Sequence, residues 1–304
     1  MPVIRPLAFA ALLVVAACVA AAPPDQRRAP AAALRAPDGA TAVQVPGRHP
    51  DGITLRGLLY RPAAPGRRPA VLMMHGCAGA FSRSGRLKAR PDSWARRLVG
   101  QGYVVLVLDS FNPRGVNTIC QMRERPVSSD LDRPFDAFAG LAYLRGLDGV
   151  DPDRIALMGW SHGATSVLNT LRREGRAAFR PPARDFRAAV AFYPGCRRLA
   201  EEPFTPAVPL LMLLGGADDW TPAKHCVRLA KAAQGGAPVT YRVFDGAHHS
   251  FDHPDLPLRV VKAGGYRSGS GFRQVHVGSH PRAREAAVAD ALAFLRHGLG
   301  NGAE

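Results

Sequence analysis

The sequence predicts one α/β domain, built on a mostly parallel β-sheet with helices on both of its faces. Two observations along the 304 residues lead to this prediction. Short, continuous apolar runs recur, and such runs are typical of strands that are buried on both faces of a sheet. Helical stretches lie between these runs, and the alternation indicates parallel βαβ units with right-handed crossovers.

The predicted elements begin near residue 53. Residues 53–60 alternate between apolar and polar side chains, which indicates an early strand of an antiparallel hairpin. Ligands bind a parallel sheet at the carboxyl ends of its strands, so we expect the chemistry directly after each apolar run. The runs predict strands over 70–74, 103–108, 155–158, 188–192, 208–214 and 239–244. Helices are predicted over 93–100, 130–147, 162–173, 222–234 and 284–297.

The first 40 residues lie outside this pattern. Residues 1–22 contain one Arg, an apolar run and then small residues, which is the layout of a secretory signal peptide. Residues 15–18 (VAAC) also resemble a lipobox, in which Cys18 would become the lipidated N-terminus; simple cleavage after residue 20, 21 or 22 is the alternative. Residues 23–40 are predicted to be an unstructured linker and residues 41–304 the folded domain. We therefore expect an exported protein, either periplasmic, secreted or lipid-anchored.

The composition excludes several classes of protein. Apolar residues make up 47% and charged residues 21% of the chain, which excludes a fully disordered protein. A mean hydropathy of −0.07 and a single apolar N-terminal stretch exclude a polytopic membrane protein. The net charge of +16 comes mainly from 36 arginines that are scattered along the chain. We attribute them to codon preference in a GC-rich genome and expect no nucleic-acid partner.

Residues 159–163 read GWSHG, a G-x-S-x-G motif between a predicted strand and a predicted helix. This context is typical of a nucleophile turn, in which the glycines permit a tight bend that exposes the serine hydroxyl at a helix N-terminus. Ser161 is therefore the candidate nucleophile. A serine needs a base, and the base needs an orienting acid, which follow the serine in the order acid, then histidine.

The strand ends provide two candidates for each of these roles. Asp218 and Asp219 follow the strand over 208–214, and His248 and His249 follow the strand over 239–244. An oxyanion pocket further requires two backbone N–H donors. The N–H of His162 is one candidate, and the N–H of Cys77, in the loop HGCAG over 75–79, is the other.

With these motifs the chain resembles the dienelactone hydrolase family of α/β-hydrolases. The resemblance implies an eight-stranded sheet and a Ser/Cys–His–Asp triad. The family pattern G-x-x-D-x-x-x-P selects Asp218 over Asp219, and a histidine two residues before Phe selects His249 over His248. Dienelactone hydrolases proper use a Cys where this chain has Ser161, so we expect an ester or lactone substrate. The segments that carry the resemblance are HGCAG, GYVVLVLDSFNPRG, DPDRIALMGWSHG, FYPGC, GGADDWTPAKHC and GAHHSFD, which lie between residues 75 and 252.

The cysteines predict two disulfide bonds. Without Cys18, four cysteines are left in a chain that we expect to be exported, and four cysteines permit three pairings. Neighbouring strands bring the loops after them together at the carboxyl edge of the sheet. This placement predicts the pairs Cys77–Cys120 and Cys196–Cys226, and four free thiols are the alternative.

Other features carry weaker expectations. Arg114, Arg123, Arg125 and Arg133 are interpreted as a solvated basic surface, with binding of a substrate carboxylate as the alternative. The glycine-containing stretch 253–281 is expected to be a mobile loop beside His249 that shapes the pocket entrance. No metal-ligand spacing and no phosphate-binding glycine loop occurs in the sequence, so we expect neither a metal nor another cofactor.

The sequence thus predicts an exported serine hydrolase that cleaves small-molecule carboxylic esters or lactones. A prolyl-oligopeptidase-like peptidase shares the fold and the triad order, but the 40 residues before the domain are too few for its propeller. A binding protein that retains the fold without activity is the alternative from another class, and the intact Ser, Asp and His argue against it. The sequence does not predict the oligomeric state.

Overall fold

The computed structural model describes residues 32–264 and 273–300. The predicted signal peptide 1–22, with Cys18, lies outside the described residues, as does the linker up to residue 31. None of the helices within the described residues is long and apolar enough to span a membrane.

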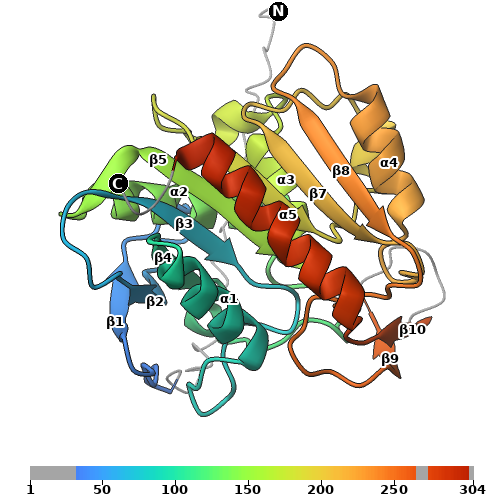
Figure 1. Ribbon diagram of the computed structural model, residues 1–304, viewed down its shortest axis with the longest axis horizontal. Helices are drawn as coiled ribbons and strands as arrows, with labels where there is room; N and C mark the ends of the chain where they lie inside the picture. Colours follow the sequence, from blue (N-terminus) through green and yellow to red (C-terminus); the bar gives the residue numbers. More distant parts are fainter. Residues whose placement is uncertain (1–31, 265–272, 301–304) are drawn as a thin grey trace, which may run out of the picture.

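An eight-stranded, mostly parallel sheet forms the centre of the domain, as predicted (Figure 1). Its strand order is β1-β2-β4-β3-β5-β6-β7-β8. β2 pairs antiparallel with both β1 and β4, and every later pairing is parallel. The strands are β1 Ala40–Val45, β2 Leu55–Tyr60, β3 Arg68–Met74, β4 Val104–Asp109, β5 Val150–Trp160, β6 Ala188–Phe192, β7 Leu210–Gly215 and β8 Val239–Phe244.

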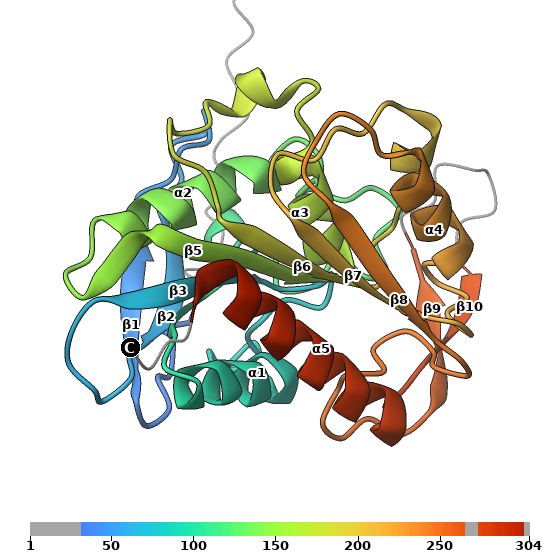
Figure 2. The same cartoon turned by 45° about the horizontal axis from the view of Figure 1, so that its top comes forward.

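Helices cover both faces of the sheet, so the central strands are apolar on both sides. α1 and α5 lie on one face, and α2 and α3 lie on the other (Figure 2). The two buried apolar clusters match this division, since Trp94 and Ala287 belong to one cluster and Phe138 and Val167 to the other. The helices are α1 Ala89–Gly100, α2 Arg133–Arg145, α3 His162–Leu171, α4 Ala223–Ala232 and α5 Pro281–Leu299.

Two helices begin earlier than predicted, and both have a proline in the first turn. α1 begins at Ala89 and includes Pro91, whereas α5 begins with Pro281 itself. A proline is tolerated there because the first helical N–H groups have no intrahelical acceptor. The side chain of His280 caps α5 by accepting a hydrogen bond from the N–H of Ala283.

The end of the predicted linker lies against the domain. The N–H of Arg35 donates to the carbonyl of Gly85 at 2.9 Å, and Ala40 already begins β1. Contacts with the domain therefore begin before residue 41 within the described residues.

The stretch 253–281 contains secondary structure where we expected a loop. β9 Arg259–Ala263 and β10 Arg273–Val277 form a separate antiparallel pair beyond the carboxyl ends of β7 and β8 (Figure 1). The N–H of Gly278 donates to the carbonyl of His249 at 3.0 Å. The pair is thereby joined to the segment that follows β8.

Candidate active site

Ser161 lies on a sharp turn between β5 and α3. It is the N-cap residue of α3 and has a φ of +51°, which is strained for a residue with a side chain. The two glycines of the motif permit the turn. A Cβ at Gly159 would lie 2.6 Å from the carbonyl oxygen of Gly163, and a Cβ at Gly163 would lie 2.1 Å from that of Met74.

The structure brings Ser161, His249 and Asp218 into one line of hydrogen bonds. The Oγ atom of Ser161 lies 2.9 Å from Nε2 of His249, and Nδ1 of His249 lies 2.8 Å from Oδ2 of Asp218. Because a carboxylate can only accept, Nδ1 carries the proton and Nε2 is left to accept the serine hydroxyl. All three residues are buried, with Ser161 8% exposed and His249 2% exposed.

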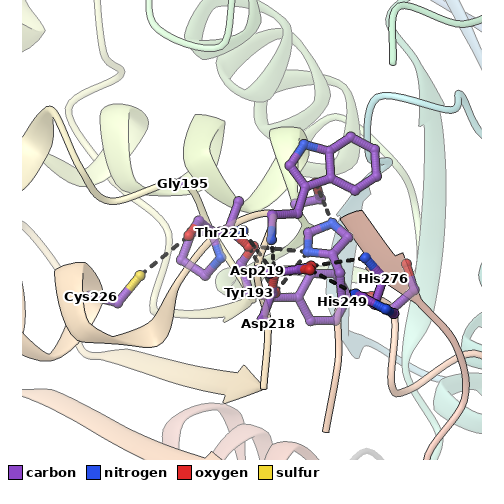
Figure 3. Close-up of polar contacts among 12 residues, drawn as sticks. Tyr193, Gly195, Asp218, Asp219, Thr221, Cys226, His249 and His276 are labelled. Carbon is purple, nitrogen blue, oxygen red and sulfur yellow. Dashed lines mark hydrogen bonds and ion pairs between the residues drawn. The ribbon is translucent and has the colours of Figure 1, made fainter. Parts of the chain in front are cut away.

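The turn after β7 orients the carboxylate of Asp218. Its Oδ1 atom accepts the N–H groups of Trp220 at 2.9 Å and Thr221 at 2.8 Å. The hydroxyl of Thr221 lies 2.9 Å from Oδ2 of Asp218, 3.1 Å from Nδ1 of His249 and 3.0 Å from the carbonyl of Tyr193 (Figure 3). These contacts hold Oδ2 toward the imidazole.

The competing candidates from the sequence form a separate group. Asp219 pairs with His276 on β10, with 2.8 Å between Oδ2 and Nδ1 (Figure 3). The ring of His248 lies 5.1 Å from the ring of His276. Neither Asp219 nor His248 contacts Ser161 or His249 through a side-chain hydrogen bond in the described part of the chain.

Sequence reasoning did not identify Tyr193 and Thr221 as parts of the site. Tyr193, with a φ of +38°, places its ring 4.6 Å from the ring of His249, and its hydroxyl donates to the buried carboxylate of Asp252. Only the FYPG segment and the threonine before Pro222 pointed to them, and neither is a general signal for a role in a triad.

Two backbone N–H groups point to an oxyanion pocket beside Ser161. The N–H groups of Cys77 and His162 have no hydrogen-bond acceptor within residues 32–264 and 273–300, although both residues are at least 94% buried. Buried N–H groups without an acceptor are rare in folded proteins. These two are therefore suited to receive an oxygen atom of a substrate.

His75 sets the direction of the Cys77 N–H. Its Nε2 accepts the N–H of Ser110 at 3.2 Å, so the proton is on Nδ1, which donates to the carbonyl of Gly76 at 2.8 Å. The C=O and N–H of one trans peptide point in opposite directions, so the N–H of Cys77 points away from His75. Burial, together with the charge of Arg133, lowers the pKa of His75 well below its usual value and keeps the ring neutral.

Two of the four arginines are not on a solvated surface, and this corrects our interpretation. Arg114 is 7% exposed and forms a bidentate ion pair with Asp136, with N–O distances of 2.8 and 2.9 Å. Arg133 is fully buried, whereas Arg123 is exposed. Arg125 is partly exposed, and its Nη2 donates to the carbonyl of Gly264 at 3.0 Å. Asp136 explains the burial of Arg114, because a paired charge can leave water.

Both disulfide bonds have the pairing that the strand order predicts. Cys77 is joined to Cys120 and Cys196 to Cys226, with S–S distances of 2.05 and 2.04 Å. The first bond lies beside the N–H of Cys77. No group of three or more His, Cys, Asp or Glu side chains within the described residues is arranged to hold a metal ion.

The chain has sequence relatives among known proteins. The chain is 35% identical to the quorum-quenching protein AidA of Acinetobacter baumannii over 120 residues, which cover 40% of this chain and only 36% of AidA. It is 31% identical to an uncharacterized Mycobacterium tuberculosis protein over 222 residues, which cover 66% of this chain and 69% of that protein.

A solved structure shows the same fold. Esterase 2 of Thermogutta terrifontis superposes with a TM-score of 0.59 at 19% identity, over 88% of this chain and 97% of the esterase. The sequence profile of the dienelactone hydrolase family matches residues 55–299. With an eight-stranded α/β-hydrolase sheet and this match over most of its length, the chain belongs to the dienelactone hydrolase family.

Proposed function

We propose that the protein is an exported serine hydrolase that cleaves small-molecule carboxylic esters or lactones through an acyl-enzyme. One observation carries the proposal: the line Ser161–His249–Asp218 ends beside two backbone N–H groups that have no acceptor in the described residues. This is the geometry that acyl transfer requires, with a nucleophile, a base, an orienting acid and a pocket for negative charge.

The reaction has two halves. Oγ of Ser161 attacks the carbonyl carbon while its proton passes to Nε2 of His249, and the carbonyl oxygen becomes an oxyanion that accepts the N–H groups of Cys77 and His162. The C–O bond to the leaving alcohol then breaks, and His249 returns the proton to the alcohol. Water attacks the acyl-enzyme by the same route and releases the acid, while Asp218 stabilises the imidazolium in both halves.

The burial of the site supports a small substrate. Ser161 and His249 expose 8% and 2% of their surfaces, so a side group of a folded protein does not reach them without rearrangement. A peptidase of the prolyl-oligopeptidase kind and an inactive binding protein are the alternatives that the tests must separate.

Labelling with a fluorophosphonate probe tests the nucleophile, with Ser161→Ala as the matched control. Labelling of the unsubstituted protein alone supports the proposal, and its absence would favour the binding protein. Turnover of a panel of esters, lactones and peptides then separates the substrate classes. Peptide cleavage without ester cleavage would favour the peptidase.

Export is supported by the two disulfide bonds and by the signal-like layout of residues 1–22. The intact mass of the protein from a bacterial host with a lipoprotein pathway tests it. A diacylglyceryl group on Cys18 supports a lipid anchor, whereas a start near Pro23 supports simple cleavage. An unprocessed Met1 would contradict export.

A further inference from the structure

Arg133 is a buried charge that the hydrolytic mechanism does not yet use. It is the first residue of α2, it is 0% exposed, and no carboxylate within the described residues forms an ion pair with it. Asp136, one turn further along α2, hydrogen-bonds Arg114 through both oxygens and acts on Arg133 only through its charge. Burial of a charge without an ion pair is costly, so the position of this guanidinium calls for a reason other than stability.

Its hydrogen bonds join the two backbone segments that form the oxyanion pocket. Nη1 of Arg133 donates to the carbonyl of His75 at 2.7 Å and lies 3.1 Å from Nδ1 of His162. Since a guanidinium can only donate, Nδ1 of His162 accepts, and each of the two Nη1 hydrogens has one partner. His75 comes two residues before the Cys77 N–H, and His162 carries the other N–H itself.

The remaining contacts lock the guanidinium in place. Nε lies 3.3 Å from Oγ of Ser110, and the guanidinium carbon lies 5.4 Å from the ring centroid of Phe111. Nη2 is buried and has no hydrogen-bond partner in the described residues, so the hydrogen bonds of the guanidinium there come from Nη1 and Nε. Burial lowers the pKa of Arg133 to about 10, which leaves it charged at neutral pH.

A covalent bond also links the segment that carries Cys77 to the chain that precedes Arg133. Burial, followed by the charge of Arg133, lowers the pKa of His162 well below its usual value, and the backbone of Val127 acts on the ring in the opposite direction. The loop before Val127 contains Cys120, which the disulfide joins to Cys77. Arg133 therefore completes a closed path from one oxyanion donor to the other.

We propose that Arg133 is a positioning residue that sets the spacing of the Cys77 and His162 N–H groups and places a positive charge behind the oxyanion. This role rests on the proposed hydrolase function. It acts on the transition state and not on the ground state, because the oxyanion forms only when Ser161 has attacked.

The role predicts a loss in kcat with little change in KM. Loss of one oxyanion donor costs about 10²–10³ in kcat. Arg133→Met should shift the N–H groups of Cys77 and His162 without removing either of them, so its cost should be smaller. We expect kcat to fall about 10–100-fold and KM to change less than about threefold. Arg133→Lys retains a charge and a donor, and its kcat should fall between that of Arg133→Met and that of the unsubstituted protein.

Arg145→Met is the matched control. Arg145 is the last residue of α2, its Nε donates to the carbonyl of Pro152 at 3.1 Å, and its Nη2 is also buried without a partner in the described chain. This variant should retain kcat even where it lowers the melting temperature. If Arg133 only stabilised the fold, Arg133→Met and Arg145→Met would both lower the melting temperature and both retain kcat.

A trifluoromethyl ketone provides a second measurement, because its hemiketal with Ser161 places an oxyanion in the pocket. Its inhibition constant should weaken by the same factor as kcat in Arg133→Lys, which tests the role even where Arg133→Met does not fold. If kcat and the inhibition constant of the Arg133 variants both stayed within twofold of the unsubstituted values, the proposed role of Arg133 would be wrong, but the proposed hydrolase function would stand. Absence of turnover and labelling in the unsubstituted protein would refute both proposals.

Discussion

Two His–Asp pairs lie side by side in this protein, and within the described residues only one of them contacts a serine. Asp218–His249 and Asp219–His276 have the same N–O distance of 2.8 Å. The side chains of the first pair are 0% and 3% exposed, whereas those of the second are 36% and 46% exposed. The second imidazole belongs to β10 and faces solvent. The distance within a pair therefore does not distinguish the two pairs, whereas burial and the contact with Ser161 do.

The largest difference between the two pairs is expected when each imidazole is removed in turn. His249→Ala should lower kcat by about 10⁶, as removal of a triad histidine does, because Ser161 then lacks its base. His276→Ala and His248→Ala should change kcat less than about tenfold, since neither ring contacts Ser161. Steady-state ester hydrolysis measures all three, and a greater loss in either of the latter two variants would mean that the base is wrongly assigned.

Substitution of the two carboxylates should also affect kcat unequally, with the larger loss at Asp218. Asp218→Asn should lower kcat by about 10⁴, because an amide cannot hold His249 in the tautomer that leaves Nε2 free to accept. Asp219→Asn is the isosteric control, and its kcat should stay within a few-fold of the unsubstituted protein. Equal losses in the two variants would show that the neighbouring pair also supports catalysis.

Burial also predicts how stability responds to pH. The pKa values of His75 and His162 are lowered, first by burial and then by Arg133, so both rings stay neutral in the fold while the unfolded chain takes up protons below about pH 6.5. The free energy of unfolding should therefore fall as the pH drops from 7 to 5, with a slope of up to about 1.4 kcal/mol per pH unit for each ring.

Urea unfolding at several pH values measures this slope. His75→Asn should reduce it, whatever its effect on stability at pH 7. An unchanged slope in His75→Asn would contradict neutral burial of the ring.

The smallest effect should come from breaking the exposed pair. Exposed ion pairs contribute about 0.2–1 kcal/mol, so His276→Ala should lower the free energy of unfolding by no more than this. Burial opposes ionisation of Asp219, but hydrogen bonds from His276 outweigh it and lower the pKa of the carboxyl. The contribution is thus present above about pH 4 and is lost as the pH falls further. In His276→Ala, faster amide hydrogen exchange that is confined to β10 would show the loss of this pair. Faster exchange throughout the protein would contradict a local role of the pair.

The central sheet and the nucleophile turn could be predicted because their signals are local. β3, β4 and β6 consist mainly of continuous apolar runs because helices cover both of their faces. The two glycines of the motif lie within five residues of sequence, although only Gly159 is required by a backbone contact within the turn and Gly163 is required by the carbonyl of Met74 on β3. The position of Asp218 and His249 at strand ends follows from the same alternation. The choice between neighbours such as His248 and His249 came from the family resemblance.

Features that depend on tertiary contacts could not be predicted in this way. The strands β9 and β10 contain several charged residues and have little apolar pattern, and they pair with each other from either side of residues 265–272. Arg133 looks like a surface residue in the sequence, because its partners His75 and His162 are 58 and 29 residues away. Thr221 and Tyr193 likewise meet only when β6 and β7 lie next to each other.

The two disulfide bonds join cysteines that are consecutive in the chain, with sequence separations of 43 and 30 between the partners. Cys77 and Cys120 can pair before Cys196 has emerged from a ribosome or a translocation channel. Once Cys18 has been lipidated or removed, as proposed above, an oxidase that links cysteines in their order of appearance would therefore make both native bonds at the first attempt. The protein should consequently mature in a host that has a thiol oxidase but lacks a disulfide isomerase.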